Sequence, residues 1–175
     1  MGTPDTSSDA PRLSRLGIRG RALLTKLTRK DRPMGNTFAV EQIKDPLLLI
    51  SRTLMMLLFV VFGWQKLTGY SGTIAYFAQS GVPLPSLAAP IAVILELGVG
   101  IAIVFGLFTR PLAVLLGLYT LATGVLGHHF WTMSGAEQVE AEINFFKNVS
   151  IMSGLFVLYV TGAGRFSLDE KLNLG

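Results

Sequence analysis

The sequence predicts an all-α integral membrane protein built as a four-helix bundle, and three observations support this class. Half of the 175 residues are hydrophobic, and only 15% are charged. The mean hydropathy is +0.52, which is rare for a water-soluble domain of this size. Four apolar stretches are long enough to cross a bilayer core, which takes about 20 helical residues. They cover residues 46–65, 87–108, 112–131 and 145–163.

A soluble helical bundle is the main alternative for such a chain. Its helices would combine an apolar stripe with a charged outer face at a period of about 3.6 residues. None of the four stretches shows that pattern, so we favour spans in a lipid bilayer. The chain has no cysteine, which excludes disulfides and thiolate metal sites made from its own groups.

The first 45 residues are expected to form a basic, partly disordered N-terminal extension on the cytoplasmic side. They hold nine of the fifteen Lys and Arg residues. Leucines recur among these basic residues at helical spacing, which is typical of a short amphipathic helix on an anionic membrane surface. A flexible basic tail that only enforces topology is the alternative. Residues 46–172 are expected to form the membrane domain.

The distribution of positive charge predicts that both termini are cytoplasmic. Besides the N-terminal extension, the turn between the second and third spans holds Arg110, and the C-terminal tail adds Arg165 and Lys171. The loop over residues 132–146 holds three glutamates and neither Lys nor Arg. We therefore expect this loop, and the loop over residues 66–86, on the outer side.

The first outer loop is expected to contain a short interfacial helix near residues 72–80. Tyr70, Ile74 and Phe77 fall on one face at helical spacing, and Gly81 with the prolines that follow it ends the helix. We expect this helix to lie flat on the outer membrane surface, where it would cover what the bundle encloses.

Charge inside the hydrocarbon region is costly, so an ionisable residue there marks a candidate functional site. At about 1.5 Å per residue, Arg52 lies about 9 Å inside the cytoplasmic end of the first span. The same count places Glu96 about 16 Å inside that end of the second span. An extended arginine can reach across the difference of about 7 Å. We therefore expect an intramembrane ion pair of Arg52 and Glu96, which either fixes the helix register or relays a proton.

Helical spacing also predicts which faces of the spans turn towards other helices. Polar and small residues share a face in three spans, and small residues alone form a stripe in the second span, roughly opposite Glu96. The predicted faces are Arg52, Met56, Phe59, Gly63 and Lys66; Gly98, Ala102 and Gly106; Gly117, Thr120, Gly124 and His128; and Lys147, Ser150 and Gly154.

Several cofactors and partners are disfavoured by the residues present. The two histidines are consecutive on one helix, whereas a bis-histidine haem needs ligands on facing helices. Glu96 is the one acidic residue inside the predicted spans, which does not suit a metal cluster. P-loop, GxSxG and GxGxxG elements are absent from the sequence. We therefore expect no metal, covalent cofactor or nucleic acid.

Several motifs together resemble the DoxX family of membrane proteins. The order and approximate spacing of that family are found in "SRTLMMLLFVVFGWQKLTGY", "GVPLP", "ILELGVGIAIVFGLFTRP", "HHFW" and "INFFKNVSIMSG". The resemblance covers about residues 46–172. It implies a small four-helix, multi-pass protein of the bacterial inner (cytoplasmic) membrane, in a family named for a quinone-linked sulfur oxidoreductase subunit. Family positions carry over to Arg52, Gln65, Lys66, Glu96, Thr109, Arg110, Pro111, His128, Phe145, Lys147 and Asn148.

Three functions are compatible with these features. The preferred one is a small inner-membrane subunit of a quinone-linked oxidoreductase, at most a non-autonomous part of an enzyme, with oxidoreductase subunits and the lipid bilayer as partners. A membrane anchor or assembly protein is the alternative. A small-molecule carrier is less favoured, because no inverted repeat with broken helices is evident. No catalytic residue is assigned, and the residues expected to bind a quinone or polar head group are Gln65, Lys66, His128, Lys147 and Asn148.

Overall fold

The computed structural model describes residues 35–174, with side chains from residue 41 onwards. The chain divides into two units between residues 42 and 43, and the features below belong to the second unit, Ile43–Gly175. The predictions for residues 1–34, including the amphipathic helix, lie outside the described residues. Within the described part, the secondary structure is helical and contains no strand.

Four helical segments among the described residues are long and apolar enough to cross a membrane, which confirms the predicted class. The first span, Glu41–Thr68, lies within helix α2 (Gly35–Thr68). The second, Pro85–Phe105, consists of α4 (Pro85–Val93), the π-helix η2 (Ile94–Val99) and α5 (Gly100–Phe105). The third, Thr109–Thr132, combines α6 (Thr109–Gly127) with the short 3-10 helix η3 (Phe130–Thr132). The fourth is α7 (Gly135–Thr161).

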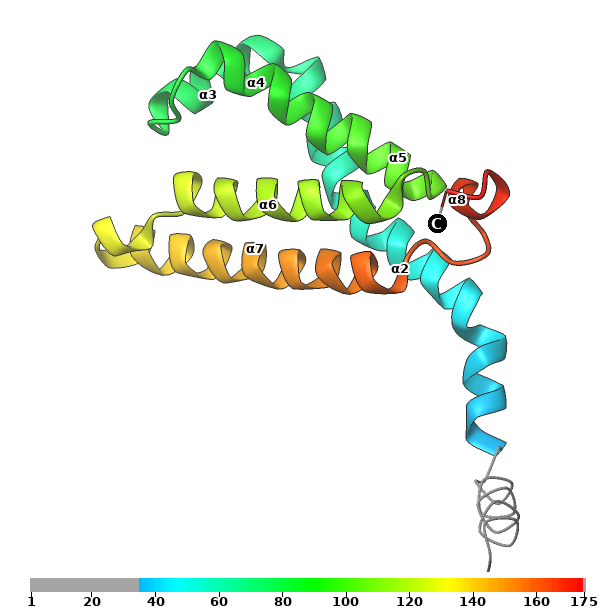
Figure 1. Cartoon of the computed structure of the whole chain (residues 1–175). Coiled ribbons are helices and arrows are strands. Elements are labelled where there is room, and N and C mark those ends of the chain that lie inside the picture. Colours follow the sequence, from blue (N-terminus) through cyan, green and yellow to red (C-terminus); the bar gives the residue numbers. More distant parts are fainter. Residues whose placement is uncertain (1–34, 175) are drawn as a thin grey trace, which may run out of the picture. The chain divides into compact units, whose positions relative to one another are not determined.

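Two short helices complete the described chain. In the first loop, α3 (Tyr70–Gln79) confirms that a helix forms there, while its position on a membrane surface stays a prediction. After α7, the chain turns into α8 (Leu168–Lys171) (Figure 1). We call the end of the bundle at Phe105, Thr109 and Thr161 the terminal end; α2 enters the second unit on this side, at Ile43. The opposite end, at Thr68, Pro85, Thr132 and Gly135, is the loop end.

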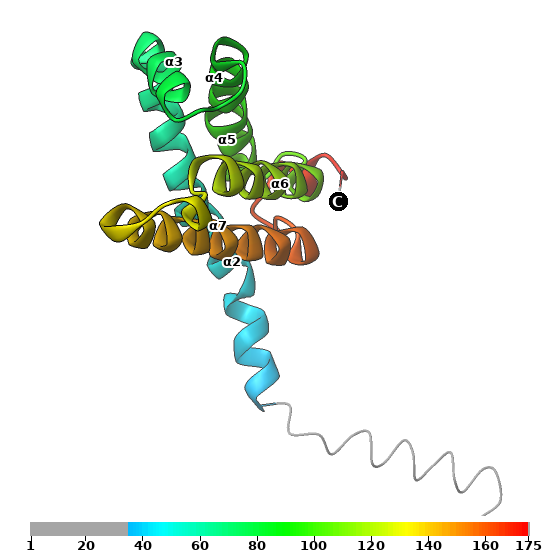
Figure 2. The same cartoon turned by 90° about the vertical axis from the view of Figure 1, so that its left-hand side faces the viewer.

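Close helix packing depends on a few glycines. The antiparallel helices α6 and α7 lie side by side in both views (Figures 1 and 2). Where α2 meets η2, a Cβ atom on Gly63 would lie 2.6 Å from the backbone nitrogen of Leu97. A backbone atom cannot move aside as a flexible side chain can, so only glycine permits this approach. Gly100 and Gly154 similarly face α2, at Val60 and Met55 respectively.

The core lies where these helices meet. Met56, Phe59, Ile103, Leu116 and Leu155 are buried there and pack together. Many other large apolar side chains are exposed on the surface of the chain, including Leu54 (64%) and Val160 (71%). Such a surface suits a lipid solvent, because lipid tails are as apolar as the side chains that face them.

The structure confirms most of two predicted faces and only part of the other two. Arg52, Met56, Phe59 and Gly63 of α2 are buried, with Lys66 partly buried, and so are Gly117, Thr120 and Gly124 of α6. In contrast, Lys147 and Ser150 of α7 are exposed, because α7 packs through Ala141, Leu155 and Leu158, and only Gly154 of this predicted face meets α2. Gly98 faces open space, because the second span packs through Gly100 and Ile103, on the side of Glu96, whereas Gly106 of the same predicted stripe is buried.

The predicted loop over residues 132–146 is also corrected. Helix α7 begins at Gly135, ten residues before the apolar stretch that marked the fourth span. Glu137, Glu140 and Glu142 are exposed on its first turns. A helix can continue beyond the hydrocarbon core when its polar side chains reach water, so hydropathy finds the membrane-embedded part of a helix and misses its extension.

Candidate functional site

Glu96 lies in a locally unusual part of the second span. It belongs to η2, whose hydrogen bonds follow the wider π pattern in place of the α pattern. Short π segments inside α-helices are rare and occur frequently at functional sites. The residue is only 7% exposed. A buried carboxylate needs partners, since an isolated charge in a low-dielectric interior is strongly unfavourable.

Two side chains from two other spans hold this carboxylate. Lys66 Nζ, on α2, donates a hydrogen bond to Glu96 Oε2 at 2.7 Å and forms a salt bridge with it. Tyr119 Oη, on α6, donates to Glu96 Oε1 at 2.6 Å. Both contacts are short, as expected for hydrogen bonds to an ionised acceptor. Glu96, Lys66 and Tyr119 therefore form a buried polar triad that joins three spans.

The predicted ion pair between Arg52 and Glu96 is not found, and side-chain direction explains why. Side chains on a helix lean towards its N-terminus. Since α2 starts at the terminal end, Arg52 and Lys66 both lean towards that end; Glu96 leans towards the loop end, because its span starts at Pro85. Lys66 and Glu96 therefore approach each other, whereas Arg52 and Glu96 lean apart.

Arg52 instead anchors the C-terminal segment at the terminal end. It is 1% exposed, and its guanidinium donates to the carbonyl oxygens of Ala163 at 2.6 Å and Phe166 at 2.9 Å. Gly106 makes room for it, since a Cβ there would lie 2.7 Å from Arg52 Nη1. Glu96 is ten residues away from Gly106 on the same span, about 15 Å along a helix axis. Arg52 therefore has a structural role far from the triad.

A groove at the loop end opens beside the triad. It has a volume of about 300 Å³ and is formed by the last turns of α2 and by α3. Lys66 belongs to both features, because its ammonium group binds Glu96 while its side chain lines the groove. Lys66 Nζ also lies 5.7 Å from the ring centroid of Phe62, a cation–π distance. The groove is lined by Phe62, Gln65, Lys66, Gly69, Gly72, Thr73, Tyr76 and Phe77.

The five residues expected to bind a quinone or head group are not gathered at one cavity. Gln65 and Lys66 line the groove beside the triad. Lys147 lines a separate surface groove near Leu58 and bonds to Asn144 Oδ1 at 3.3 Å. His128, at the end of α6, and Asn148, which packs near Gly124, line neither groove. Among residues 35–174, no three His, Cys, Asp or Glu side chains are grouped so as to hold a metal ion.

Sequence reasoning missed Tyr119 as a partner of Glu96. The available signal was a phenol in the middle of an apolar span, since a buried tyrosine hydroxyl usually finds a hydrogen-bond partner. Asp169 was missed as well. Its carboxylate accepts hydrogen bonds from the backbone nitrogens of Phe108 at 2.6 Å and Thr109 at 2.9 Å, at the start of α6. Because Asp169 lies about 60 residues further along the chain, no local pattern indicates this cap.

Comparisons with known proteins decide the family. The sequence model of the DoxX family matches residues 47–129. Inner membrane protein YphA of Escherichia coli (strain K12) is 50% identical over 125 residues, which cover 71% of this chain and 89% of YphA. The chain belongs to the DoxX family. Inner membrane protein YqjF of the same organism is 39% identical over 134 residues, covering 77% of this DoxX protein and 98% of YqjF.

A more distant relative carries a functional name. The Bacillus subtilis (strain 168) protein named "Putative oxidoreductase CatD" is 39% identical over 70 residues, which cover 40% of this DoxX protein and 51% of CatD. No solved structure matches the chain significantly. Together with the four spans, the inner-membrane relatives establish a multi-pass protein of the inner (cytoplasmic) membrane.

Proposed function

We propose that this DoxX protein is a small subunit of a quinone-linked oxidoreductase system, of the respiratory, sulfur or detoxifying kind, without a redox group of its own. The observation that carries the proposal is the double role of Lys66, which binds the buried Glu96 and lines the groove at α3. Through Lys66, a ligand in the groove would be linked to a carboxylate inside the membrane.

The groove has the chemistry that a quinone ring requires. Its volume of about 300 Å³ is at the lower end of the range for small-molecule sites. Phe62, Tyr76 and Phe77 supply aromatic surface, while Gln65 and Lys66 supply hydrogen-bond donors for carbonyl oxygens. When bound, a quinone supplies the two-electron acceptor chemistry that the side chains lack.

The residues of the triad have distinct roles in this proposal. The ammonium group of Lys66 favours a ligand that gains negative charge on reduction. Glu96 balances that positive charge and offers a site for a proton, and Tyr119 fixes the second carboxylate oxygen. Gln65 and Lys66 form the ligand site, whereas His128, Lys147 and Asn148 lie outside it. The electrons must reach the groove from a partner subunit.

The proposal includes an orientation and partners. Besides the buried Arg52, the described cations near the terminal end are Lys44, Arg110, Arg165 and Lys171, which favours a cytoplasmic position for this end. The groove and an interfacial α3 are then on the outer side. Residues 1–45 form a basic cytoplasmic extension ahead of the membrane domain of residues 46–172, and oxidoreductase subunits are the expected partners. The relative CatD, which is named as an oxidoreductase, supports this proposal.

Purification in mild detergent tests the proposal most directly. Mass spectrometry of the purified protein should find a quinone and oxidoreductase subunits. Lys66→Met should accumulate in the membrane and lose the quinone, since it removes the ammonium group that the groove shares with Glu96. Lys147→Met is the matched control, because Lys147 is an exposed cation of another span, α7, and lines a different groove. The control should retain the quinone.

Two outcomes would count against a quinone-linked subunit. Equal retention of quinone by wild type, Lys66→Met and Lys147→Met would show that the groove beside Lys66 is not the quinone site. Recovery of protein partners with no quinone in the wild type would favour the membrane anchor, and the triad would then be a structural ion pair.

A further inference from the structure

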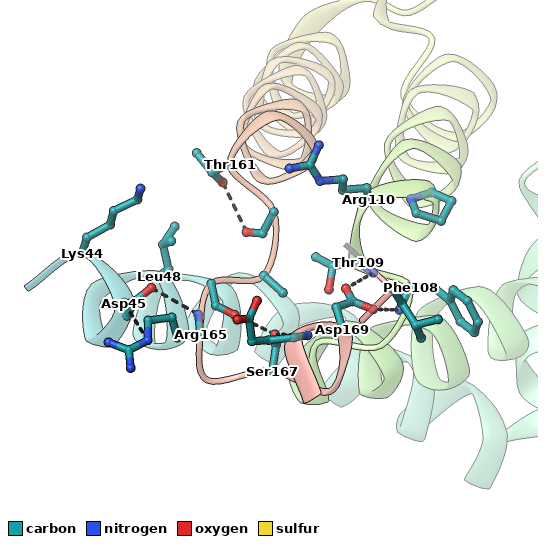
Figure 3. A pocket seen from close by; sticks show the side chains of 16 residues that line it. Lys44, Asp45, Leu48, Phe108, Thr109, Arg110, Thr161, Arg165, Ser167 and Asp169 are labelled. Atoms are coloured by element: carbon teal, nitrogen blue, oxygen red, sulfur yellow. Dashed lines mark hydrogen bonds and ion pairs between the residues drawn. The ribbon is translucent and has the colours of Figure 1, made fainter. Parts of the chain in front are cut away.

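A second cavity lies at the terminal end, on the opposite side of the bundle from the triad. It has a volume of about 310 Å³ and lies between the start of α6, the end of α7, the segment before α8, and α2 near Lys44 (Figure 3). We propose that this cavity binds a phosphate group, supplied by a phospholipid head group or by a small phosphate ester. The proposal is independent of the quinone-linked function.

The lining of the cavity holds three cations and three carboxylates, and two of the carboxylates are already bound within the protein. Asp169 accepts hydrogen bonds from two backbone nitrogens, and Asp45 binds Arg165 through the Arg165 backbone nitrogen at 3.1 Å and Nε at 3.9 Å. These two carboxylates are therefore compensated internally. Arg110 and Lys44 have no carboxylate partner among the described residues, and Glu170 is the remaining acidic side chain of the lining.

Arg110 is the principal candidate ligand. It lies at the start of α6 with its guanidinium next to Gly162, where a Cβ would lie 3.4 Å from both Nε and Nη2. Figure 3 shows it on the opposite side of the cavity from Lys44. A guanidinium presents several donors in a planar fork that matches two phosphate oxygens.

Thr109 supplies the second, independent observation. Its side chain is fully buried and lines the cavity, and its hydroxyl has no hydrogen-bond partner among the described residues. In Figure 3 the Thr109 side chain lies between Arg110 and Asp169 at the cavity wall. Buried hydroxyls are normally paired, because removing one from water without a partner is unfavourable. A phosphate oxygen in the cavity would accept this hydrogen bond.

The position of the cavity at the ends of the spans points to a lipid as the source of the phosphate. Three of the spans end beside this cavity and the first passes it at Lys44, so in a bilayer the cavity would lie where the hydrocarbon core meets the head groups. Leu48, Phe108 and Pro111 add apolar lining beside the cations, and Phe108 is 52% exposed. A phospholipid would place its phosphate by Arg110 and its glycerol and acyl carbons along these side chains. Basic pockets at this level are suited to anionic head groups.

Native mass spectrometry of the full chain in detergent can test this site with three probes. They are phosphatidylglycerol, a diacylglycerol with the same acyl chains, and glycerol phosphate. We expect retention of phosphatidylglycerol and not of diacylglycerol. Arg110→Gln should weaken phosphatidylglycerol binding about tenfold, because it removes a charge-assisted contact. Thr109→Val keeps the side-chain shape and should weaken binding about threefold without lowering the melting temperature.

Lys171→Gln is the matched control, because it removes a positive charge at the same end without lining the cavity. It should change binding less than twofold. Glycerol phosphate binding as tightly as phosphatidylglycerol would support the phosphate site and identify a soluble ester as its source. Equal losses in Arg110→Gln and Lys171→Gln, or equal retention of diacylglycerol, would overturn the proposal.

Discussion

Glu96 shows how one buried residue can set the register of three helices. Its carboxylate binds a cation on α2 through one oxygen and a phenol on α6 through the other. Removing one partner of such a pair leaves an uncompensated charge, whereas removing both partners leaves none. We therefore expect the triad to add specificity to the packing of these helices, and its contribution is measurable only by changing its members together.

A double-mutant cycle on Glu96→Gln and Lys66→Met tests this interaction. Each single variant should lower the stability of the protein in detergent, and the double variant should be more stable than the sum of the two effects predicts. We expect a coupling free energy of about 1–3 kcal/mol, typical of side chains in direct contact. Reversible unfolding in detergent measures it. Additive effects would show that the two groups do not interact in solution.

The residues of the triad could be predicted only in part. A carboxylate in an apolar span made Glu96 a candidate functional residue. The helix face on which it lies follows from helical spacing alone and needs no knowledge of the tertiary structure. The partner was not predictable by axial distance alone, since Arg52 and Lys66 lie on the same face of α2. The lean of each side chain selects Lys66, and applying that rule to the predicted topology would have identified it.

At the scale of helices, the contact between α2 and η2 brings Lys66 within reach of Glu96. Gly63 lies one turn before Lys66 and touches the backbone of Leu97, the residue after Glu96. Hydropathy predicted the spans because a bilayer selects for apolar length. It gives no signal for the π-helix η2, because that depends on contacts with other helices. It also misses the start of α7 at Gly135, because the first turns of α7 carry polar side chains outside the hydrocarbon region.

Gly63→Ala should separate α2 from η2. The new methyl group would lie 2.6 Å from a backbone nitrogen, so the helices must shift, at about 1–3 kcal/mol of stability. Gly98→Ala, in η2 on the other side of this contact, is the matched control, because nothing lies within 4 Å of its Cβ position. Thermal unfolding in detergent should show a clear loss for the first variant and little change for the second. Equal melting temperatures would contradict the close contact.

The cap at the start of α6 permits a second test at this scale. Asp169→Ala leaves the backbone nitrogens of Phe108 and Thr109 without their acceptor and should cost about 1–2 kcal/mol, as for other helix caps. Glu170→Ala, which removes a neighbouring carboxylate, should have little effect. Hydrogen exchange of the first turn of α6 should be faster in the first variant alone. Unchanged protection in Asp169→Ala would rule out this capping role.

At the scale of the whole molecule, four spans require the two ends of the membrane domain to face the same compartment. The terminal end carries Arg110, Arg165 and Lys171, while Glu137, Glu140 and Glu142 lie at the loop end. Positively charged segments are retained in the cytoplasm during insertion, whereas acidic residues contribute little. With the orientation that we propose, the cavity beside Arg110 lies on the cytoplasmic side and the groove beside Lys66 on the outer side.

Reporter fusions to the full chain test this orientation. Green fluorescent protein fused after Gly175 should fluoresce, and alkaline phosphatase inserted at Ser134 should be active, because the first reporter folds in the cytoplasm and the second outside it. Exchanging the two reporters should abolish both signals. Replacing Arg110, Arg165 and Lys171 together by Gln should increase the inverted fraction, because these cations contribute to retention. An active phosphatase after Gly175 in the unaltered chain would reverse the orientation and place the groove beside Lys66 in the cytoplasmic half.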